Sequence, residues 1–278
     1  SGLTSGVSAI TAGYRHICAL TTSGGVKCWG ANWYGQLGDG TTTDHLTPAN
    51  VSGLSSGVTA IAAGVEHTCA LTSSGGIQCW GNNSNGQVGD GTTTNRTIPV
   101  NVSGATTGMT AVDTGNFHTC ALTSGGGIKC WGNNFSGQLG DGTTIQRLTP
   151  VAVSGLTSGA TAVSAGGGHT CALTTNGGVQ CWGSNNFGEL GDGTLTRRST
   201  PAYVTGLTGM PAPTPTPTFT PTFTPTPIPS GPVTINYVYD PLYRLKEANY
   251  SNGDYYHYTY DAVGNRLTQT SSVIGLPS

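Results

Sequence analysis

The feature that most constrains this chain is a unit of 51 residues that occurs four times in tandem. The segment SGLTSGVSAI begins at Ser1, and close copies begin at Ser52, Ser103 and Ser154, each 51 residues after the last. A fifth start, at Thr205, is cut short. Four copies without an insertion predict a repeat architecture, in which each unit buries its apolar face against its neighbours.

Each unit carries the signals of short β-strands. In the first unit the runs are VSAITAG, HICALT, VKCWG and TPANV, separated by Gly, Ser and Thr. Four short strands in about 50 residues fit the size of a propeller blade. No sustained helical periodicity occurs. We therefore expect an all-β fold of four tandem four-stranded propeller-type blades, followed by an extended polyproline linker and a C-terminal β-hairpin segment.

Eight cysteines form the strongest chemical pattern in the chain. They fall in four pairs with the same ten-residue separation, on the two sides of a Gly-rich hairpin turn. A non-hydrogen-bonded antiparallel pair in a hairpin brings the facing Cα atoms to about 4.5 Å, within disulfide reach. A shift of one residue in register would put the two cysteines on opposite faces. We expect one disulfide per unit, with small buried thiols as the alternative. The pairs are Cys18 and Cys28, Cys69 and Cys79, Cys120 and Cys130, and Cys171 and Cys181.

A histidine and a tryptophan also keep the 51-residue step. We expect both to be structural: a buried imidazole that ties strands together, and an indole that packs between blades rather than stacking on a ligand. Zinc needs four convergent ligands, and one histidine with two cysteines falls one short, so no metal site is expected. The lone aspartate of each GDGT segment fits turn chemistry better than a calcium loop. The histidines are His16, His67, His118 and His169, and the tryptophans are Trp29, Trp80, Trp131 and Trp182.

Composition excludes several classes of function. The net charge is −2 and the ten Lys and Arg residues are scattered, so we expect no nucleic-acid partner. No apolar run is long enough to span a membrane. We find no nucleophile–base pair or phosphate loop, so we expect no enzyme, no catalytic residue and no cofactor. Paired cysteines with few charges favour an oxidising setting, hence an extracellular or cell-surface location. The start at a repeat boundary, without a visible signal peptide, suggests a mature or excised product.

The segment AGYRHICALTTSGGVKCWGANWYGQLGDGT is similar to the repeat of the regulator of chromosome condensation family, which carries G-x-x-H, A-L-T, W-G-x-N and G-Q-L-G in that order. All four units follow the pattern, except that Val88 replaces a Leu and Glu189 replaces a Gln. The resemblance covers residues 1–206 and implies propeller blades, usually seven in that family. Four blades would close a smaller ring, stay open or be completed by something else. The scattered basic residues argue against the namesake's chromatin and GTPase-exchange roles.

Composition changes abruptly after the repeats, which predicts three segments: blades at 1–208, a Pro/Thr-rich linker at 209–232 and a tail at 233–278. Alternating Pro and Thr favour a polyproline-II spacer. Its threonines are candidates for O-glycosylation. They are Thr214, Thr216, Thr218, Thr220, Thr222, Thr224 and Thr226.

The tail contains two Y-x-Y-D motifs, each followed by R-L, and resembles the YD (Rhs) repeat of successive β-hairpins. A lone pair of hairpins is marginal in water and leaves unpaired edges, so we expect it to dock on a partner. Tyrosines supply large amphipathic area for that contact. The predicted assembly interface consists of Tyr237, Tyr239, Tyr255, Tyr256, Tyr258 and Tyr260.

These features together predict a non-enzymatic extracellular bacterial structural or adhesive protein. We expect it to assemble head to tail into a filament or surface polymer, with the C-terminal strands completing a neighbouring subunit. Its partner would then be a second copy, with a surface glycan or protein as a further possibility. One alternative is a fragment of a larger YD-type secreted toxin or adhesin. Another is a monomeric propeller that binds a carbohydrate or protein.

Overall fold

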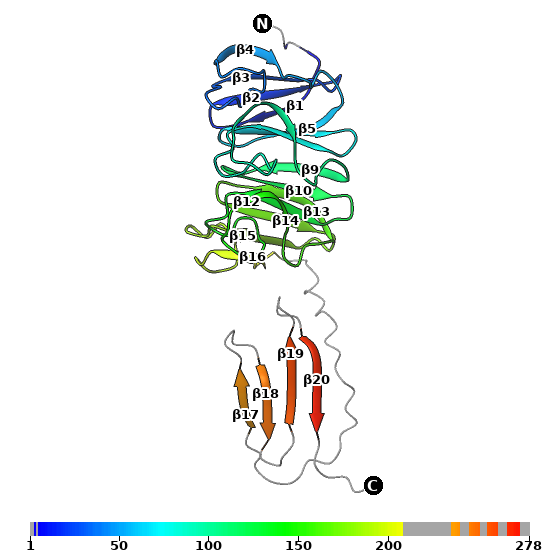
Figure 1. The fold of residues 1–278 in the computed structure, drawn as a ribbon, viewed down its shortest axis with the longest axis vertical. Helices are drawn as coiled ribbons and strands as arrows, with labels where there is room; N and C mark the ends of the chain where they lie inside the picture. The colour runs from blue at the N-terminus through cyan, green and yellow to red at the C-terminus, as the bar shows by residue number, and fades with distance from the viewer. Residues whose placement is uncertain are drawn as a thin grey trace. The chain divides into compact units, whose positions relative to one another are not determined.

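The structure is a computed structural model that describes residue 3, residues 5–207 and four strands between residues 235 and 272. Two compact units, Ser1–Thr214 and Pro215–Ser278, make up the chain (Figure 1). Every regular element in the described ranges is a β-strand, so the prediction of an all-β fold is confirmed. Within the same ranges no helix is long and apolar enough to cross a membrane.

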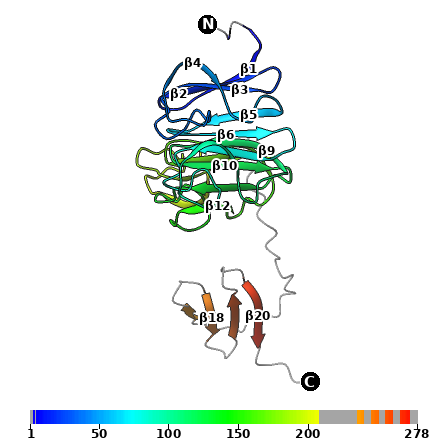
Figure 2. The same ribbon diagram turned by 45° about the horizontal axis from the view of Figure 1, so that its top comes forward.

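The first unit consists of four blades, each an antiparallel sheet in which consecutive strands are neighbours (Figure 2). The predicted four-stranded blades are therefore confirmed. The first blade contains β1 (Val7–Ala12), β2 (His16–Thr21), β3 (Val26–Gly30) and β4 (His45–Asn50). The second contains β5 (Val58–Ala63), β6 (His67–Thr72), β7 (Ile77–Gly81) and β8 (Arg96–Asn101). The third contains β9 (Met109–Thr114), β10 (His118–Thr123), β11 (Ile128–Gly132) and β12 (Arg147–Ala152), and the fourth β13 (Ala160–Ala165), β14 (His169–Thr174), β15 (Val179–Gly183) and β16 (Arg198–Tyr203).

The second unit contains one antiparallel sheet in the order β17-β18-β19-β20, so the hairpins expected in the tail join into a single sheet. The strands are β17 (Ile235–Tyr239), β18 (Leu245–Tyr250), β19 (Tyr255–Tyr260) and β20 (Arg266–Ser272). The linker at 209–232, with its threonines, lies outside the described residues. The spacer, its glycosylation and the segment boundaries at 208 and 232 stay predictions.

A disulfide crosses the central hairpin of every blade. In the first blade Cys18 of β2 pairs directly opposite Cys28 of β3, because the tight turn between the strands fixes their register. Gly24 adopts a φ of +80° in that turn, a conformation that favours glycine. In all four bridges the two Cα atoms are 4.1 Å apart. Closing so short a loop stabilises each hairpin by on the order of 3 kcal/mol through the entropy of the unfolded chain.

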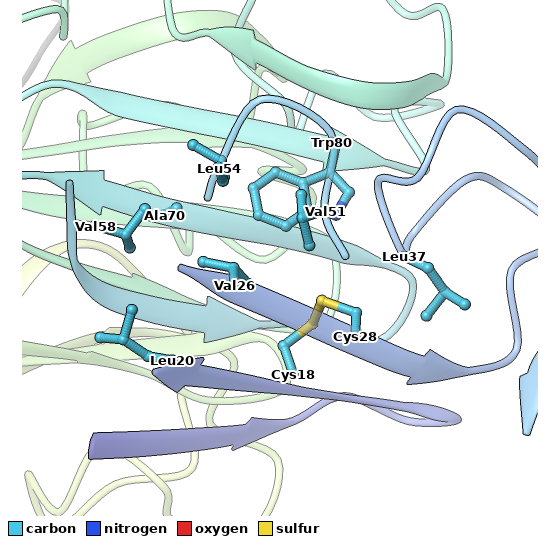
Figure 3. Packing of buried hydrophobic residues seen from close by; sticks show 10 residues of the cluster. All are labelled: Cys18, Leu20, Val26, Cys28, Leu37, Val51, Leu54, Val58, Ala70 and Trp80. Atoms are coloured by element: carbon cyan, nitrogen blue, oxygen red, sulfur yellow. A yellow bond between two sulfur atoms is a disulfide. The ribbon is translucent and has the colours of Figure 1, made fainter. Parts of the chain in front are cut away.

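Neighbouring blades pack the disulfide side of one against the tryptophan side of the next. At the first junction, Trp80 and Val58 of the second blade lie in one cluster with the Cys18–Cys28 bridge and Val51 of the first (Figure 3). Two further clusters repeat this packing around Trp131 and Trp182. All three indoles are fully buried. Burial of such large apolar side chains supplies much of the cohesion between blades.

Buried hydrogen bonds lock each junction. The main-chain carbonyl of Gln36 accepts hydrogen bonds from the Trp80 indole and the Thr68 hydroxyl, both at 2.9 Å. His16 Nε2 lies 2.8 Å from the same hydroxyl oxygen. Because the hydroxyl gives its one proton to the carbonyl, the imidazole donates from Nε2, and Nδ1 is an acceptor without a partner among the described residues. The same bonds recur with His67, Thr119, Gln87 and Trp131, and with His118, Thr170, Gln138 and Trp182.

Burial keeps these histidines neutral. It lowers the pKa of His67 to about 3, helped by the repulsion of a charge on His118 or His16. Burial lowers the pKa of His118 to about 3, and the repulsion of a charge on His169 adds to this effect. Burial alone lowers the pKa of His16 to about 4. A neutral imidazole is the form that can donate from Nε2 without carrying a charge into the junction.

The four blades make three junctions and leave the arc open. The first and fourth blades lie at opposite ends of the row in Figure 1, and no hydrogen bond joins them among the described residues. Trp29 of the first blade and His169 of the fourth are only half-buried, unlike their counterparts. Leu173 of the fourth blade is 42% exposed, whereas Leu122 at the same position of the third is 7% exposed. Within residues 5–207 the outer sides of the first and fourth blades are therefore not covered by another blade.

We predict that Thr119→Val weakens the junction between the second and third blades. The change keeps the side chain's size but deprives the Gln87 carbonyl and His67 Nε2 of a buried partner, so the free energy of unfolding should fall by about 1–3 kcal/mol. Thr110→Val is the matched control, since its exposed hydroxyl bonds only Leu122 O within its own blade. Urea unfolding measures both changes, and equal losses would contradict the assignment.

The free energy of unfolding should also fall as the pH is lowered from about 6.5 to about 4.5, a range above that in which most carboxylates titrate. The pKa of His67 and His118 lies near 3 in the fold, below the value of about 6.5 in an unfolded chain. Between pH 6.5 and about 4.5 the unfolded state binds more protons, so each histidine removes up to about 1.4 kcal/mol per pH unit. Urea unfolding at a series of pH values measures the slope. His118→Gln should flatten it, and an unchanged slope would exclude this histidine as a source.

Candidate functional site

The longer loops of the blades gather at one edge of the first unit. His16 at the start of β2 pairs with Gly30 at the end of β3, so the β1–β2 turn and the β3–β4 loop lie at the same edge. The other blades have the equivalent pairing. We call this edge the loop face; it consists of residues 13–15 and 31–44 and their equivalents 64–66 and 82–95, 115–117 and 133–146, and 166–168 and 184–197. The short β2–β3 turns lie at the opposite edge.

A buried asparagine holds each long loop in shape. The amide of Asn83 donates to Asp90 Oδ1 at 3.1 Å and to the Thr92 carbonyl at 3.0 Å, while its oxygen accepts from the Val88 amide at 3.0 Å. Asp90 in turn accepts from the Arg96 guanidinium at 2.6 Å. The same scaffold recurs around Asn32, Asn134 and Asn185. The aspartate of each GDGT segment therefore anchors its own turn.

Hydrogen bonds keep these aspartates ionised. Burial would raise the pKa of Asp90, but hydrogen bonds from Thr92 and Arg96 outweigh it and hold that pKa below its ordinary value. The pKa of Asp192 falls to about 2, because Thr194 and Arg198 hydrogen-bond its carboxylate. In the first blade His45 replaces the arginine and lies 2.7 Å from Asp39. The carboxylates are thus committed to the loop scaffold and are not free for acid–base chemistry.

The tips of the loop face differ among the four blades while the opposite edge stays nearly constant. The β2–β3 turns read TTSGG, TSSGG, TSGGG and TTNGG. The β1–β2 turns instead read GYR, GVE, GNF and GGG, and the tips of the long loops read WY, SN, FS and NF. Several of the tip aromatics are largely exposed: Tyr14, Trp33, Phe135 and Phe187. The loop face therefore differs from blade to blade far more than the opposite edge does.

The β1–β2 turns of all four blades enclose a shallow pocket of about 320 Å³ on this face. Its wall is built from small residues and main chain. Amide hydrogen bonds link the blades around it, from Tyr14 to the Val65 carbonyl, from Val65 to Asn116 and from Asn116 to Gly167. We call it the axial pocket. A concave surface of this kind can receive a side chain or loop of a partner.

The third blade supplies the polar side of the axial pocket. Thr114 lines it where the other blades have alanine, and its buried hydroxyl has no hydrogen-bond partner among the described residues. Asn116 lines the pocket beside it. Asp113 accepts the Ala165 amide at 2.8 Å, which joins the third blade to the fourth. The pocket is therefore chemically asymmetric, with a free hydroxyl and an amide on one side.

The first blade supplies a cation held by aromatic rings. The Arg15 guanidinium carbon lies 5.1 Å from the centre of the Tyr14 ring and 5.2 Å from that of Trp33. Such cation–π contacts restrict the side chain while leaving its N–H groups available. Among the described residues Arg15 has no ion-pair partner within 4.0 Å. It adds a positive, pre-oriented donor to the rim of the loop face.

The loop face is suited to non-covalent recognition. Exposed aromatics, amides and one arginine around a shallow pocket are the residue types enriched where proteins bind proteins. Within the described residues no three His, Cys, Asp or Glu side chains gather in a way that could hold a metal ion. The buried histidines lie in the junctions rather than at a surface.

The structure places the residues singled out in the sequence mainly in the scaffold. It pairs all eight cysteines within their own hairpins. The repeat histidines and tryptophans face blade junctions, with Trp29 and His169 at the uncovered ends. Of the tail tyrosines, Tyr237 and Tyr239 lie on β17 and the others on β19, and β18 separates these strands. Their role in assembly stays a prediction.

Motif reading overlooked the residues that distinguish one blade from another. Tyr14, Arg15, Thr114 and Asn116 occupy positions whose identity changes from copy to copy. Conserved landmarks draw attention to the scaffold, because a repeat is recognised by what its copies share. The loop face is indicated instead by the positions at which the four repeats, otherwise alike, carry different residues.

Comparison with known proteins covers the blades. Residues 2–214 match the model of the RCC1-like domain. The chain is 35% identical over 202 residues to the ultraviolet-B receptor UVR8 of Arabidopsis thaliana, covering 71% of this chain and 46% of that protein. It is 35% identical over 205 residues to the human E3 ubiquitin-protein ligase HERC2, covering 72% of this chain and 4% of that protein. The match spans under half of each relative's length.

These findings correct the predicted function. The relatives are plant and mammalian proteins named as a photoreceptor and ubiquitin ligases, so the prediction of an extracellular bacterial structural or adhesive protein, filamentous and self-assembling, is wrong. The alternative of a YD-type secreted toxin or adhesin fragment is overturned by the same relatives. Of the two ligands predicted for a monomeric propeller, the carbohydrate is not supported, whereas a protein stays a prediction. Low charge and the tail segment favoured a structural protein, whereas the repeat itself is what these relatives share. The relatives do not test the compartment by itself, and the absence of catalysis stays a prediction. The matched residues, 2–214, do not include the tail, so they give no support to its resemblance to YD repeats.

The partners predicted also need correction. Solved structures with similar folds include human WBSCR16, with a TM-score of 0.68, 26% identity, and coverage of 76% of this chain and 56% of that one. Yeast Prp20p has a TM-score of 0.62 at 22% identity, covering 72% of this chain and 51% of that one, and its reported binding is to Gsp1p and histones. That likeness shows the fold alone. The relatives at 35% identity are named as a receptor and a ubiquitin ligase, so a homopolymer or a surface glycan is not supported as the partner. With its residues 2–214 matched and its blades built alike, the chain belongs to the RCC1-like domain family.

Proposed function

We propose that the blades form a protein-binding module that recognises a partner protein through the loop face. The observation that carries the proposal is the concentration of copy-to-copy differences there, around the axial pocket. A scaffold of four like blades would present four like edges if stability alone governed its sequence. The β2–β3 turns are nearly identical in the four blades, whereas the loop tips differ.

The chemistry of the tips supports a protein partner. Tyr14, Trp33 and Phe135 offer large rigid area that loses little conformational entropy on binding. Arg15 and Asn116 add hydrogen-bond donors that can give orientation and specificity. The preformed loops, held by Asn83 and its equivalents, reduce the ordering cost of association.

The relatives support a regulatory setting for the module rather than a structural one. The relatives at 35% identity are a light receptor and ubiquitin ligases, and each is longer than the matched region. A propeller of this kind within a longer protein selects the partner on which the remainder acts or by which it is controlled. The module itself performs no chemistry in this proposal, in keeping with aspartates and histidines that are committed to the scaffold.

Site-specific photo-crosslinking tests the proposal. Benzoylphenylalanine placed at Phe135 on the loop face should yield discrete protein adducts in an extract of the cells that express the protein. The same residue at Ser124, exposed on the opposite turn of the same blade, should yield none above background. A second loop-face probe at Phe187 should give the same adduct as Phe135.

A variant on the same face separates binding from stability. Phe135→Ser should reduce the Phe187 adduct about tenfold while leaving the melting temperature unchanged, since Phe135 is 66% exposed. Equal adducts from Ser124 and Phe135, or none from either loop-face position, would refute the proposed function.

A further inference from the structure

The main chain around the axial pocket offers acceptors for hydrogen bonds but hardly any free donors. In the second blade the Gly64 amide donates to the His67 carbonyl, and the Val65 amide donates to the Asn116 carbonyl. The amides of Gly13, Tyr14, Gly115, Asn116 and Gly166 are used in the same way. By contrast, no main-chain hydrogen bond among the described residues reaches the carbonyls of the four lining glycines, Gly13, Gly64, Gly115 and Gly166.

These glycine carbonyls follow one another from blade to blade along the pocket wall. A Cβ on Gly13 would clash with the carbonyl oxygen of Gly64, and a Cβ on Gly64 would clash with that of Gly115. The carbonyl of Gly166 stands in the same relation to Gly115. Only glycine leaves room for so close an approach. Main-chain carbonyls grouped in this way carry partial negative charges that attract a cation.

Buried histidine nitrogens behind the glycines add to the negative potential. A Cβ on Gly64 would lie 2.6 Å from Nδ1 of His67, which has no hydrogen-bond partner among the described residues. His16 and His118 lie in the same way behind the glycines of the first and third blades. In a neutral imidazole that donates from Nε2, the lone pair is on Nδ1. Three such lone pairs therefore lie behind the wall, out of contact with anything that occupies the pocket.

The third blade adds side-chain acceptors to the pocket. Thr114 lines it with a buried hydroxyl that has no partner among the described residues, and Asn116 beside it is exposed. The carboxylate of Asp113 accepts the Thr114 amide at 2.9 Å and the Ala165 amide at 2.8 Å, which fixes a negative charge next to the lining. At the position of Thr114 the other blades contribute a methyl group, from Ala12, Ala63 and Ala165.

A small cation with several N–H donors complements these groups. An ammonium group has three donors and no acceptor, whereas a carboxylate has only acceptors and would meet further lone pairs. A guanidinium is a planar fork that suits a facing carboxylate, and of the described residues that line the pocket none carries one. A lysine side chain joins an apolar stem to a charged head. Its methylenes can pack on the alanines while the ammonium stays partly hydrated in so shallow a pocket.

We propose that the axial pocket binds the ammonium group of a lysine side chain of the partner protein. Thr114 Oγ1 and Asn116 Oδ1 accept two of its hydrogen bonds, and the glycine carbonyls and Asp113 stabilise its charge. This inference rests on the proposed function, because it names the residue type that anchors a partner on the loop face. The alanines and glycines of the other blades form the wall against which the lysine stem lies.

N-acetyl-lysine methylamide is a defined probe for the full chain. Three matched compounds separate the features of the lysine: the norleucine derivative lacks the ammonium group, the trimethyl-lysine derivative keeps the charge without N–H donors, and the arginine derivative carries a planar cation. Methyl carbon–proton spectra follow the methyl groups of Thr114 and Ala63, which line the pocket from two blades. Thr114→Ala and Ala63→Gly assign the two resonances.

The lysine probe should shift both methyl resonances in a saturable manner. The norleucine and trimethyl-lysine probes should bind at least tenfold more weakly, and the arginine probe about threefold more weakly. Thr114→Ala, followed by the Ala63 methyl, should weaken the lysine probe about tenfold, because it removes a hydrogen bond to a charged group. The norleucine probe should not change. Alanine is the residue of the other blades at this position, so the melting temperature should hold.

Two further variants complete the series. Asn116→Val introduces the second blade's residue at the equivalent position, Val65, and should also weaken the lysine probe several-fold. Thr110→Val, on the same blade and outside the pocket, is the matched control and should leave the affinity unchanged. Circular dichroism of each variant verifies that the fold is retained.

Three outcomes would overturn the proposal: equal affinity for the lysine and norleucine probes, an unchanged affinity after Thr114→Ala, and the same methyl shifts with potassium chloride at equal concentration. The last would assign the pocket to an inorganic cation. The cross-links from Phe135 and Phe187 are measured without any probe. Loss of probe binding with these adducts retained would refute the lysine alone, whereas saturable probe binding without adducts would refute the proposed function alone.

Discussion

The arc depends on one buried carbonyl at each blade junction. This is the main-chain oxygen of Gln36, Gln87 or Gln138. It accepts two hydrogen bonds from the next blade, one from an indole and one from a threonine hydroxyl. The hydroxyl can serve this carbonyl only if the histidine behind it donates, which requires a neutral imidazole. Burial provides that neutrality by lowering the histidine pKa. Glycine at the turn lets the main chain approach the indole closely enough for the bond.

This junction explains which parts of the repeat are constant. The histidine, the tryptophan and the glycine turn must match between neighbours, because each bond joins one blade to the next. The disulfide and the loop asparagine act within a blade, and they too recur in every copy. The tip side chains of the loop face contribute to neither set of bonds, although Asn85 accepts a bond from Asn133 of the third blade at 3.0 Å. Exposed tips such as Phe135 and Phe187 can therefore change with little loss of cohesion, which is the physical condition for a variable binding surface on a constant scaffold.

The first and fourth blades each take part in one junction rather than two, so some of their junction residues lack a partner among the described residues. Trp29 has no preceding turn, and His169 has no following threonine among the described residues. In the first blade the position of this threonine is occupied by Ile17, which has no hydroxyl to make the bond. Low charge, paired cysteines and a Pro/Thr segment describe the solvent and redox conditions that a chain tolerates, and they do not identify what its surface recognises.

The sequence by itself determined the repeat, the four-stranded blades and the hairpin that sets each cysteine opposite its pair. These depend on local pattern: strand alternation, glycine turns and a constant 51-residue step. It could also have pointed to Tyr14, Arg15 and Ile17 through their disagreement with the other copies. Only the tertiary structure decided that the histidine bonds the next blade, that the turns of four blades meet at one pocket, and that the arc stays open. Those facts join residues about 50 or more positions apart, and the spacing of residues along a chain does not say which faces of its repeats will touch.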